Sequence, residues 1–224
     1  SAMRIESRYF IELVCGQVSK NMIGTFWYQL NEIKAGAARP KGLEPSKVKK
    51  VGILGAGMMG AGIAYSSANK GLEVVLKDIS KENAERGKAY SQKLLDKKVQ
   101  KKYLSEEKRD QILALIKASD NYADLKACDL IIEAVFEDRA LKASVTKEAE
   151  AQLTSSAIFA SNTSTLPITG LAEASERPEN FIGLHFFSPV DKMPLVEIIC
   201  GAKTSPETLA KAYDYVLQIG KTAS

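Results

Sequence analysis

A glycine-rich turn between a strand pattern and a helix pattern constrains the fold of this chain more than any other feature. The segment VGILGAGMMG carries Gly55, Gly57 and Gly60 in GxGxxG spacing. In such a turn the first glycine permits the tight bend, the second lets the backbone approach a pyrophosphate, and the third lets helix and strand pack closely. The free N–H groups of the helix then face the phosphates. The segment predicts a dinucleotide site, although glycines with this spacing also occur in ordinary turns.

A carboxylate at the end of the next apolar run supports this prediction. Asp78 lies at about the 20-residue offset from the glycines at which an acidic side chain accepts hydrogen bonds from the adenosine ribose. It would repel a 2′-phosphate, so NAD is favoured over NADP. The neighbouring Lys77 weakens this preference, because a lysine that turned toward the ribose would attract that phosphate.

Short β-branched runs alternate with helical patterns after the glycine turn. This order predicts an α/β, doubly wound, mainly parallel sheet. Residues 81–117 predict two antiparallel helices, broken near 103–105 and inserted after the second strand. Ser205 and Pro206 predict the N-cap and first turn of a last helix. Strands are expected at 50–54, 72–79, 129–135, 157–161, 181–187 and 195–199, and further helices at 58–70 and 139–153.

The first fifth of the chain has a different character. Residues 5–35 show helical periodicity without proline and predict a long helix or a helical pair. Residues 35–47 combine glycine, proline and basic residues, as linkers do, so a domain boundary is expected there. The net charge of +4 is concentrated here, with nine Lys/Arg against four Asp/Glu in residues 1–50. Because the remainder is close to neutral, binding to nucleic acid is not indicated.

Composition excludes several other classes of protein. The uncharged run 51–69 is long enough to raise the question of a membrane span, but its five glycines favour a folded strand, turn and helix. The start of the chain has no apolar segment of a secretory signal. Three separated cysteines and a single histidine cannot assemble a disulfide framework or a Cys/His zinc site. A reducing, intracellular setting fits best.

The single histidine lies where chemistry is expected. His185 follows an apolar strand pattern, and the ends of parallel strands form the ligand-binding edge of a sheet. Glu197 lies within another apolar strand, where an unpaired charge is costly and a cation or imidazole partner is expected. The polar cluster SNTS, residues 161–164, ends a further strand and offers hydroxyls to a substrate oxygen or an N-cap to a helix.

The motifs together resemble a known family. LGAGMMGAGIA with Asp78, EAVFE at 133–137, SNTS at 161–164 and HFFSPVDKMPLVEII at 185–199 closely resemble the Rossmann-like NAD-binding domain of L-3-hydroxyacyl-CoA dehydrogenases. The N-terminal helix and the proline after Met193 are most similar to the fused bacterial fatty-acid oxidation complex α subunit, which joins this dehydrogenase to an enoyl-CoA hydratase.

The resemblance implies a domain organisation and partners. Residues 1–46 would be a helical arm and linker that end a missing hydratase domain, and residues 47–224 would be the NAD-binding domain. The C-terminal helical domain of the family would be absent. The resemblance further implies an acyl-CoA substrate, a thiolase subunit as partner and a cytoplasmic location.

The same resemblance assigns roles to individual residues. His185 would be the catalytic base, Glu197 its orienting partner, and Ser164 the residue that binds the substrate oxygen. Ser91 and Lys98, two helical turns apart, would meet the phosphates of coenzyme A, or else belong to a solvated basic face. The cofactor would be contacted or lined by Gly55, Gly57, Met59, Gly60, Asp78, Val135, Glu137, Lys142 and Ser188, the last standing where many relatives have Asn.

The function expected from these features is NAD-dependent oxidation of (S)-3-hydroxyacyl-CoA to 3-ketoacyl-CoA in fatty-acid β-oxidation. One alternative is a biosynthetic 3-hydroxybutyryl-CoA dehydrogenase, against which the leading helix and linker argue. Another is a non-catalytic nucleotide-binding module, which would be favoured if His185 and Glu197 lay too far apart to hydrogen-bond.

Overall fold

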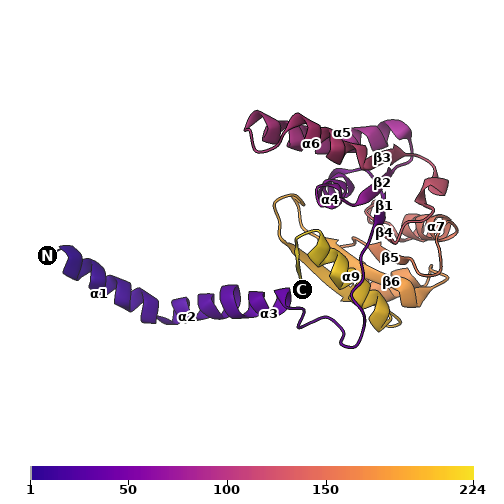
Figure 1. Cartoon of the computed structure of the whole chain (residues 1–224). Coiled ribbons are helices and arrows are strands. Elements are labelled where there is room, and N and C mark those ends of the chain that lie inside the picture. Colours follow the sequence, from indigo (N-terminus) through magenta and orange to yellow (C-terminus); the bar gives the residue numbers. More distant parts are fainter. Residues whose placement is uncertain (1) are drawn as a thin grey trace. The chain divides into compact units, whose positions relative to one another are not determined.

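The computed structural model describes residues 2–224, which divide into two compact units, one ending at Arg39 and one spanning Pro40–Ser224. The first unit is helical, as the periodicity predicted (Figure 1). Its apolar side chains, among them Phe10, Phe26 and Trp27, are exposed. Its segments are α1 (Ala2–Cys15), α2 (Gln17–Ile23), the π-helix η1 (Gly24–Gln29) and α3 (Leu30–Lys34).

The second unit is built on one eight-stranded sheet with the strand order β3-β2-β1-β4-β5-β6-β7-β8. The first six strands run parallel, β7 is antiparallel to β6, and β8 is parallel to β7. The prediction of a doubly wound, mainly parallel α/β fold is confirmed. The strands are β1 (Lys50–Leu54), β2 (Glu73–Lys77), β3 (Ile116–Ser119), β4 (Leu130–Glu133), β5 (Ile158–Ser161), β6 (Phe181–Phe186), β7 (Leu195–Cys200) and β8 (Thr222–Ala223).

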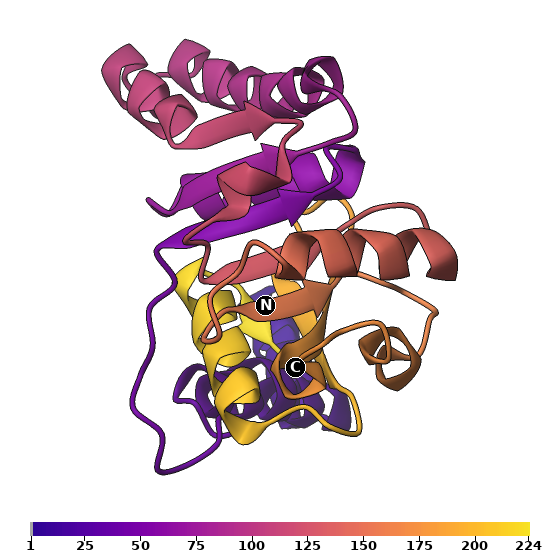
Figure 2. The same cartoon turned by 90° about the vertical axis from the view of Figure 1, so that its right-hand side faces the viewer.

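Helices cover both faces of the sheet, and each face has its own apolar cluster (Figures 1 and 2). One cluster joins the strands to α4 (Met58–Ala68), α5 (Lys81–Gln100), α6 (Glu106–Ala114) and α9 (Pro206–Gln218). The other joins them to the 3-10 helix η2 (Tyr122–Leu125), α7 (Arg139–Glu150) and α8 (Ile168–Ala172). A further 3-10 turn, η3 (Pro178–Asn180), leads into β6.

The helical hairpin inserted after the second strand is confirmed, but its predicted end is wrong. Ser80 and Ser105 cap α5 and α6, and the break between these helices lies where it was expected. The sequence predicts helix as far as residue 117, whereas β3 begins at Ile116. Ile116 and Ala118 are buried and Lys117 is exposed, so four alternating residues complete this edge of the sheet. The N-cap at Ser205 with Pro206 in the first turn is also confirmed.

The sheet places a ligand site at one edge. The strand order reverses between β1 and β4, and in folds of this type ligands bind in the crevice at the carboxyl ends of the strands beside such a reversal. The glycine turn follows β1 at this point. Among residues 2–224, no helix is both long and apolar enough to span a membrane.

Candidate active site

The glycine turn has the geometry that phosphate binding requires. Gly55 adopts a φ of +97°, and a Cβ there would lie 2.6 Å from the Ala134 carbonyl oxygen. A Cβ on Gly60 would lie 1.8 Å from the Gly55 oxygen, so only glycine lets α4 start this close to β1. A Cβ on Gly57 would meet no protein atom within 4 Å. The turn is therefore closed toward the sheet and open at Gly57, beside the N-terminus of α4.

Asp78 follows β2 and faces this turn. Its Oδ2 accepts a hydrogen bond from the Ala56 N–H at 2.6 Å, and its Oδ1 accepts from the Ile79 N–H at 2.7 Å. Asn83 Nδ2 donates to the same Oδ1 at 3.2 Å. The carboxylate is therefore fixed at the cofactor edge and also holds the glycine turn in place.

A cavity of about 720 Å³ opens over the turn. Gly55, Gly57, Met59, Asp78 and Val135, which the sequence assigned to the cofactor, line it, whereas Gly60 serves the packing of α4. Its wall includes the exposed apolar side chains of Met58, Ile79 and Phe136, which suit the flat rings of a dinucleotide. The open glycine, the helix N-terminus and the fixed carboxylate together fit NAD. Its other lining residues are Leu54, Ala56, Ala61, Lys77, Asn83, Arg86, Gly87, Tyr90, Tyr122, Ala134, Leu141 and Val145.

His185 and Glu197 face each other on adjacent strands. They are direct partners in the antiparallel register of β6 and β7, and His185 Nδ1 lies 2.7 Å from Glu197 Oε2. The predicted pairing is confirmed, but the expected burial of Glu197 is wrong, because its side chain is 46% exposed. The Phe187 ring packs against the imidazole at a centroid distance of 4.6 Å. With Nδ1 held by the carboxylate, Nε2 is left for a ligand.

The SNTS cluster lies at the same sheet edge as His185, because Ser161 pairs with Gly183 in the register of β5 and β6. Asn162 connects the two strands: its Oδ1 accepts a hydrogen bond from the Phe186 N–H at 2.8 Å. Ser164 is exposed, and its N–H donates to Glu137. The cluster was noted from the sequence, but this role of Asn162 was missed. Its position at the end of a strand, where a side-chain amide can hydrogen-bond to the neighbouring strand, was the available signal.

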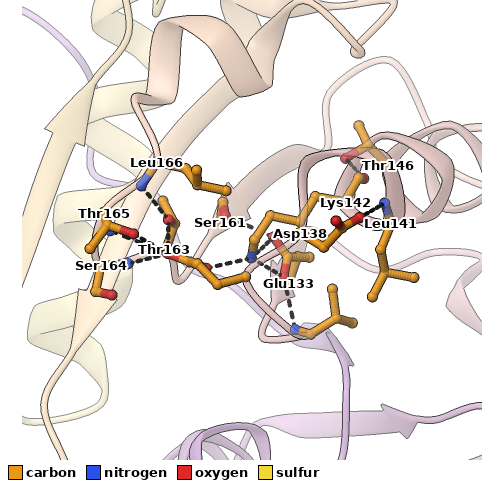
Figure 3. A network of polar contacts seen from close by, with 12 residues as sticks. Glu133, Asp138, Leu141, Lys142, Thr146, Ser161, Thr163, Ser164, Thr165 and Leu166 are labelled. Carbon is orange, nitrogen blue, oxygen red and sulfur yellow. Dashed lines mark hydrogen bonds and ion pairs between the residues drawn. The ribbon is translucent and has the colours of Figure 1, made fainter.

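A buried ion network supports the turn that carries Ser164 (Figure 3). Lys142 Nζ lies 2.8 and 3.0 Å from the two oxygens of Glu133 and 3.2 Å from Glu137 Oε2. Glu133 and Lys142 are 1% and 2% exposed. Glu133 also accepts hydrogen bonds from the Val135 N–H and the Ser161 hydroxyl. Sequence reasoning missed Glu133, although a carboxylate ending the apolar run LIIE is the signal it used for Glu197.

Glu137 extends this network to the surface. Its Oε1 accepts hydrogen bonds from the Thr163 hydroxyl and from the N–H groups of Ser164 and Thr165. Burial opposes its ionisation, but the Thr163 hydrogen bond, the Lys142 charge and the Thr165 N–H outweigh burial and lower the pKa of Glu137 to about 2. Glu137 and Lys142 thus carry charge beside the SNTS turn. Neither is part of the cavity wall.

The loop between β6 and β7 is tied to three other elements. Ser188 Oγ lies 3.7 Å from the sulfur of Met58 at the start of α4, which brings this predicted cofactor residue next to the cavity wall. The Tyr90 hydroxyl donates to Asp191 Oδ1 at 2.9 Å. Lys221 Nζ donates to the carbonyl oxygens of Val190 and Met193, each at 2.6 Å. These contacts hold the strand ends that carry His185 and Glu197, and no sequence motif indicated them.

The two residues assigned to coenzyme A have different environments. Ser91 is fully buried, and among the described residues its hydroxyl is the one buried side-chain polar atom without a hydrogen-bond partner. It therefore lies on the packing face of α5 and is closed to a phosphate in this conformation. Lys98 is half-buried, with its ammonium 5.5 Å from the Tyr65 ring centroid.

The fold and site define a class: an α/β dinucleotide-binding domain with a histidine–carboxylate pair at its ligand edge. Residues 50–223 match the family described as 3-hydroxyacyl-CoA dehydrogenase, NAD binding domain, and the chain belongs to this family. NAD is therefore its cofactor. The chain is 45% identical over 221 residues to a fatty acid oxidation complex subunit alpha of Shewanella sp., and the alignment covers 98% of this chain and 31% of that subunit. The chain thus spans about a third of the length of such relatives.

Solved structures agree with the sequence matches. The (S)-3-hydroxybutyryl-CoA dehydrogenase of Ralstonia eutropha has a TM-score of 0.76 and 43% identity, covering 79% of this chain and 62% of its own. The dehydrogenase part of multifunctional enzyme 1 from C. elegans has a TM-score of 0.73 and 28% identity, covering 88% of this chain and 48% of its own.

Proposed function

We propose that this chain supplies the NAD site and the catalytic base for oxidation of (S)-3-hydroxyacyl-CoA to 3-ketoacyl-CoA in fatty-acid β-oxidation. The observation that carries the proposal is the 2.7 Å contact between His185 Nδ1 and Glu197 Oε2 at the ligand edge of the sheet. A non-catalytic nucleotide-binding module would be favoured if these two side chains lay too far apart to hydrogen-bond, and at 2.7 Å they do not.

The chemistry follows from this geometry. Glu197 accepts the Nδ1–H of neutral His185, so the Nε2 lone pair takes the proton from the 3-hydroxyl group while Glu197 stabilises the imidazolium. NAD, when bound, accepts the hydride that leaves C3, and the C3–O bond becomes the carbonyl. Ser164, exposed beside Glu137, binds the substrate oxygen in this proposal.

The N-terminal arm favours the β-oxidation enzyme over a biosynthetic hydroxybutyryl-CoA dehydrogenase. The match to the fatty acid oxidation subunit covers 98% of the chain, whereas the match to the hydroxybutyryl-CoA dehydrogenase of Ralstonia covers 79%. The proposal includes residues 1–46 as the end of a hydratase domain, residues 47–224 as the NAD-binding domain, and a helical dehydrogenase domain beyond it. A thiolase partner, an acyl-CoA substrate and a cytoplasmic location belong to the same proposal.

A chimera tests the proposal directly. This chain would replace the 221 matched residues of the Shewanella subunit, and acetoacetyl-CoA reduction by NADH would be followed in the chimera. His185→Ala should lower turnover by about 10²–10⁴-fold, because a general base contributes that much, and NADH affinity measured by calorimetry should remain. Near-normal turnover in the His185→Ala chimera would refute the role of His185. Turnover confined to four-carbon substrates would favour the hydroxybutyryl-CoA alternative.

A further inference from the structure

Three charged side chains surround the part of the cavity where β2 ends. Lys77, Asp78 and Arg86 all line its wall. A carboxylate at this place accepts a hydrogen bond from the ribose 2′-hydroxyl of NAD, whereas a cation there accommodates the 2′-phosphate of NADP. The adjacent residues Lys77 and Asp78 therefore favour opposite cofactors. The position of each side chain decides which of them acts on the ribose.

Lys77 lines the cavity but has little exposed surface, and its ammonium lies over the Tyr122 ring. Its side chain is 8% exposed, and its ammonium lies 3.7 Å from the centre of the Tyr122 ring. This is contact distance for a cation on an aromatic face. Burial lowers the pKa of Lys77, while the carboxylates of Glu148, Asp78 and Asp120 partly oppose this effect.

The Tyr122 ring stands on an anchored turn. η2 begins at Tyr122, directly after Asn121, whose side-chain oxygen accepts the Ala123 N–H at 2.9 Å. Lys50 Nζ donates to the Asp124 carbonyl oxygen at 3.2 Å within the same turn. The ring face is therefore a fixed platform for the ammonium. Asp78, in contrast, is fixed at the cavity by the Ala56 N–H.

From this arrangement we propose that Tyr122 contributes to cofactor preference by holding the Lys77 ammonium against its ring, so that this charge does not reach the ribose 2′ position that Asp78 meets. Tyr122 acts here through Lys77 and is a positioning residue. Without the ring, the flexible four-carbon stem of Lys77 lets the ammonium turn into the cavity, where it attracts a 2′-phosphate.

The test compares NADH and NADPH affinities of the purified chain by calorimetry. Tyr122→Leu should improve the NADPH affinity relative to NADH by about fivefold or more, the equivalent of one cation–π contact. Tyr122→Phe retains the ring and should keep the wild-type ratio of affinities. The double variant Lys77→Met/Tyr122→Leu should return to that ratio. Tyr122→Met fills the same space without a ring and repeats the test if the leucine variant does not fold.

A second measurement reports on Lys77 itself. The ε-methylene protons of Lys77 should resonate upfield in the wild type, because the ring current of Tyr122 shields them, and this shift should disappear in Tyr122→Leu. The proposal is wrong if folded Tyr122→Leu and Tyr122→Met both keep the wild-type ratio, or if the gain persists after Lys77→Met. The first measurement needs only cofactor binding and the second needs no ligand, so a failure of the proposed dehydrogenase activity would leave both intact.

Discussion

Replacing Lys142 with methionine should destabilise the second unit severely. Lys142 Nζ lies 2.8 Å from Glu133 Oε1, and both side chains are almost fully buried. Removing one partner of a buried ion pair costs about 3–5 kcal/mol, because the other charge stays buried without a counter-charge. Glu133 keeps two donors, the Val135 N–H at 2.8 Å and the Ser161 hydroxyl at 2.7 Å. We therefore expect the lower end of the range, about 3 kcal/mol.

The assay is guanidinium denaturation of the wild type, Lys142→Met and matched variants. Lys147→Met removes an exposed lysine from the same helix and should change stability by less than about 0.5 kcal/mol. The double variant Glu133→Gln/Lys142→Met removes both charges and should recover most of the loss. Equal stability of Lys142→Met and Lys147→Met would refute the reasoning.

Further predictions concern the glycine turn and the acid limit of stability. Gly57→Ala should abolish most NADH binding with little change in melting temperature, because the added methyl group meets only the space reserved for the pyrophosphate. Gly60→Ala should lower both NADH affinity and melting temperature, because its methyl group would meet the Gly55 oxygen. Equal behaviour of the two variants in calorimetry and thermal melts would contradict this. The pKa of Glu137 is lowered to about 2, so its contribution to stability is present above the unfolded value of about 4.3 and is lost as pH falls through about 2. Glu137→Gln should therefore show a flatter fall in stability than the wild type across this acid range, measured by denaturant titration at several pH values, and parallel curves would count against it.

The parts of the site that could be predicted are those set by local pattern and by the geometry of parallel sheets. The glycine turn is a local motif, and the ends of parallel strands must gather at one edge, which brought the SNTS cluster to the edge that carries His185. The antiparallel partner of His185 could be predicted because a carboxylate in an apolar strand requires a neighbour. The exposure of Glu197 could not be predicted, because it follows from the place of β7 next to the edge strand of the sheet.

Helix periodicity indicates which residues of α7 and α5 are buried, which the family resemblance alone did not. Lys142, Val145 and Ala149 repeat at helical spacing, and all three are buried on one face of α7. Ser91 likewise continues the buried face of α5 formed by Ala84, Gly87 and Leu95. β3 was missed because a strand of four residues on the sheet edge has too few alternations to stand out beside a lysine-rich helix.

Asp78 has two roles, one in the structure of the glycine turn and one in cofactor recognition, and a single mutation changes both. One oxygen of its carboxylate accepts the Ala56 N–H of the glycine turn, while the same residue lines the cavity that fits the cofactor. A mutation that removes the charge of Asp78 to admit the 2′-phosphate of NADP therefore also removes a hydrogen bond that holds the loop for the pyrophosphate. Under our proposal, cofactor preference is therefore easier to change through Lys77 and Tyr122, which line the same cavity, than through Asp78 itself.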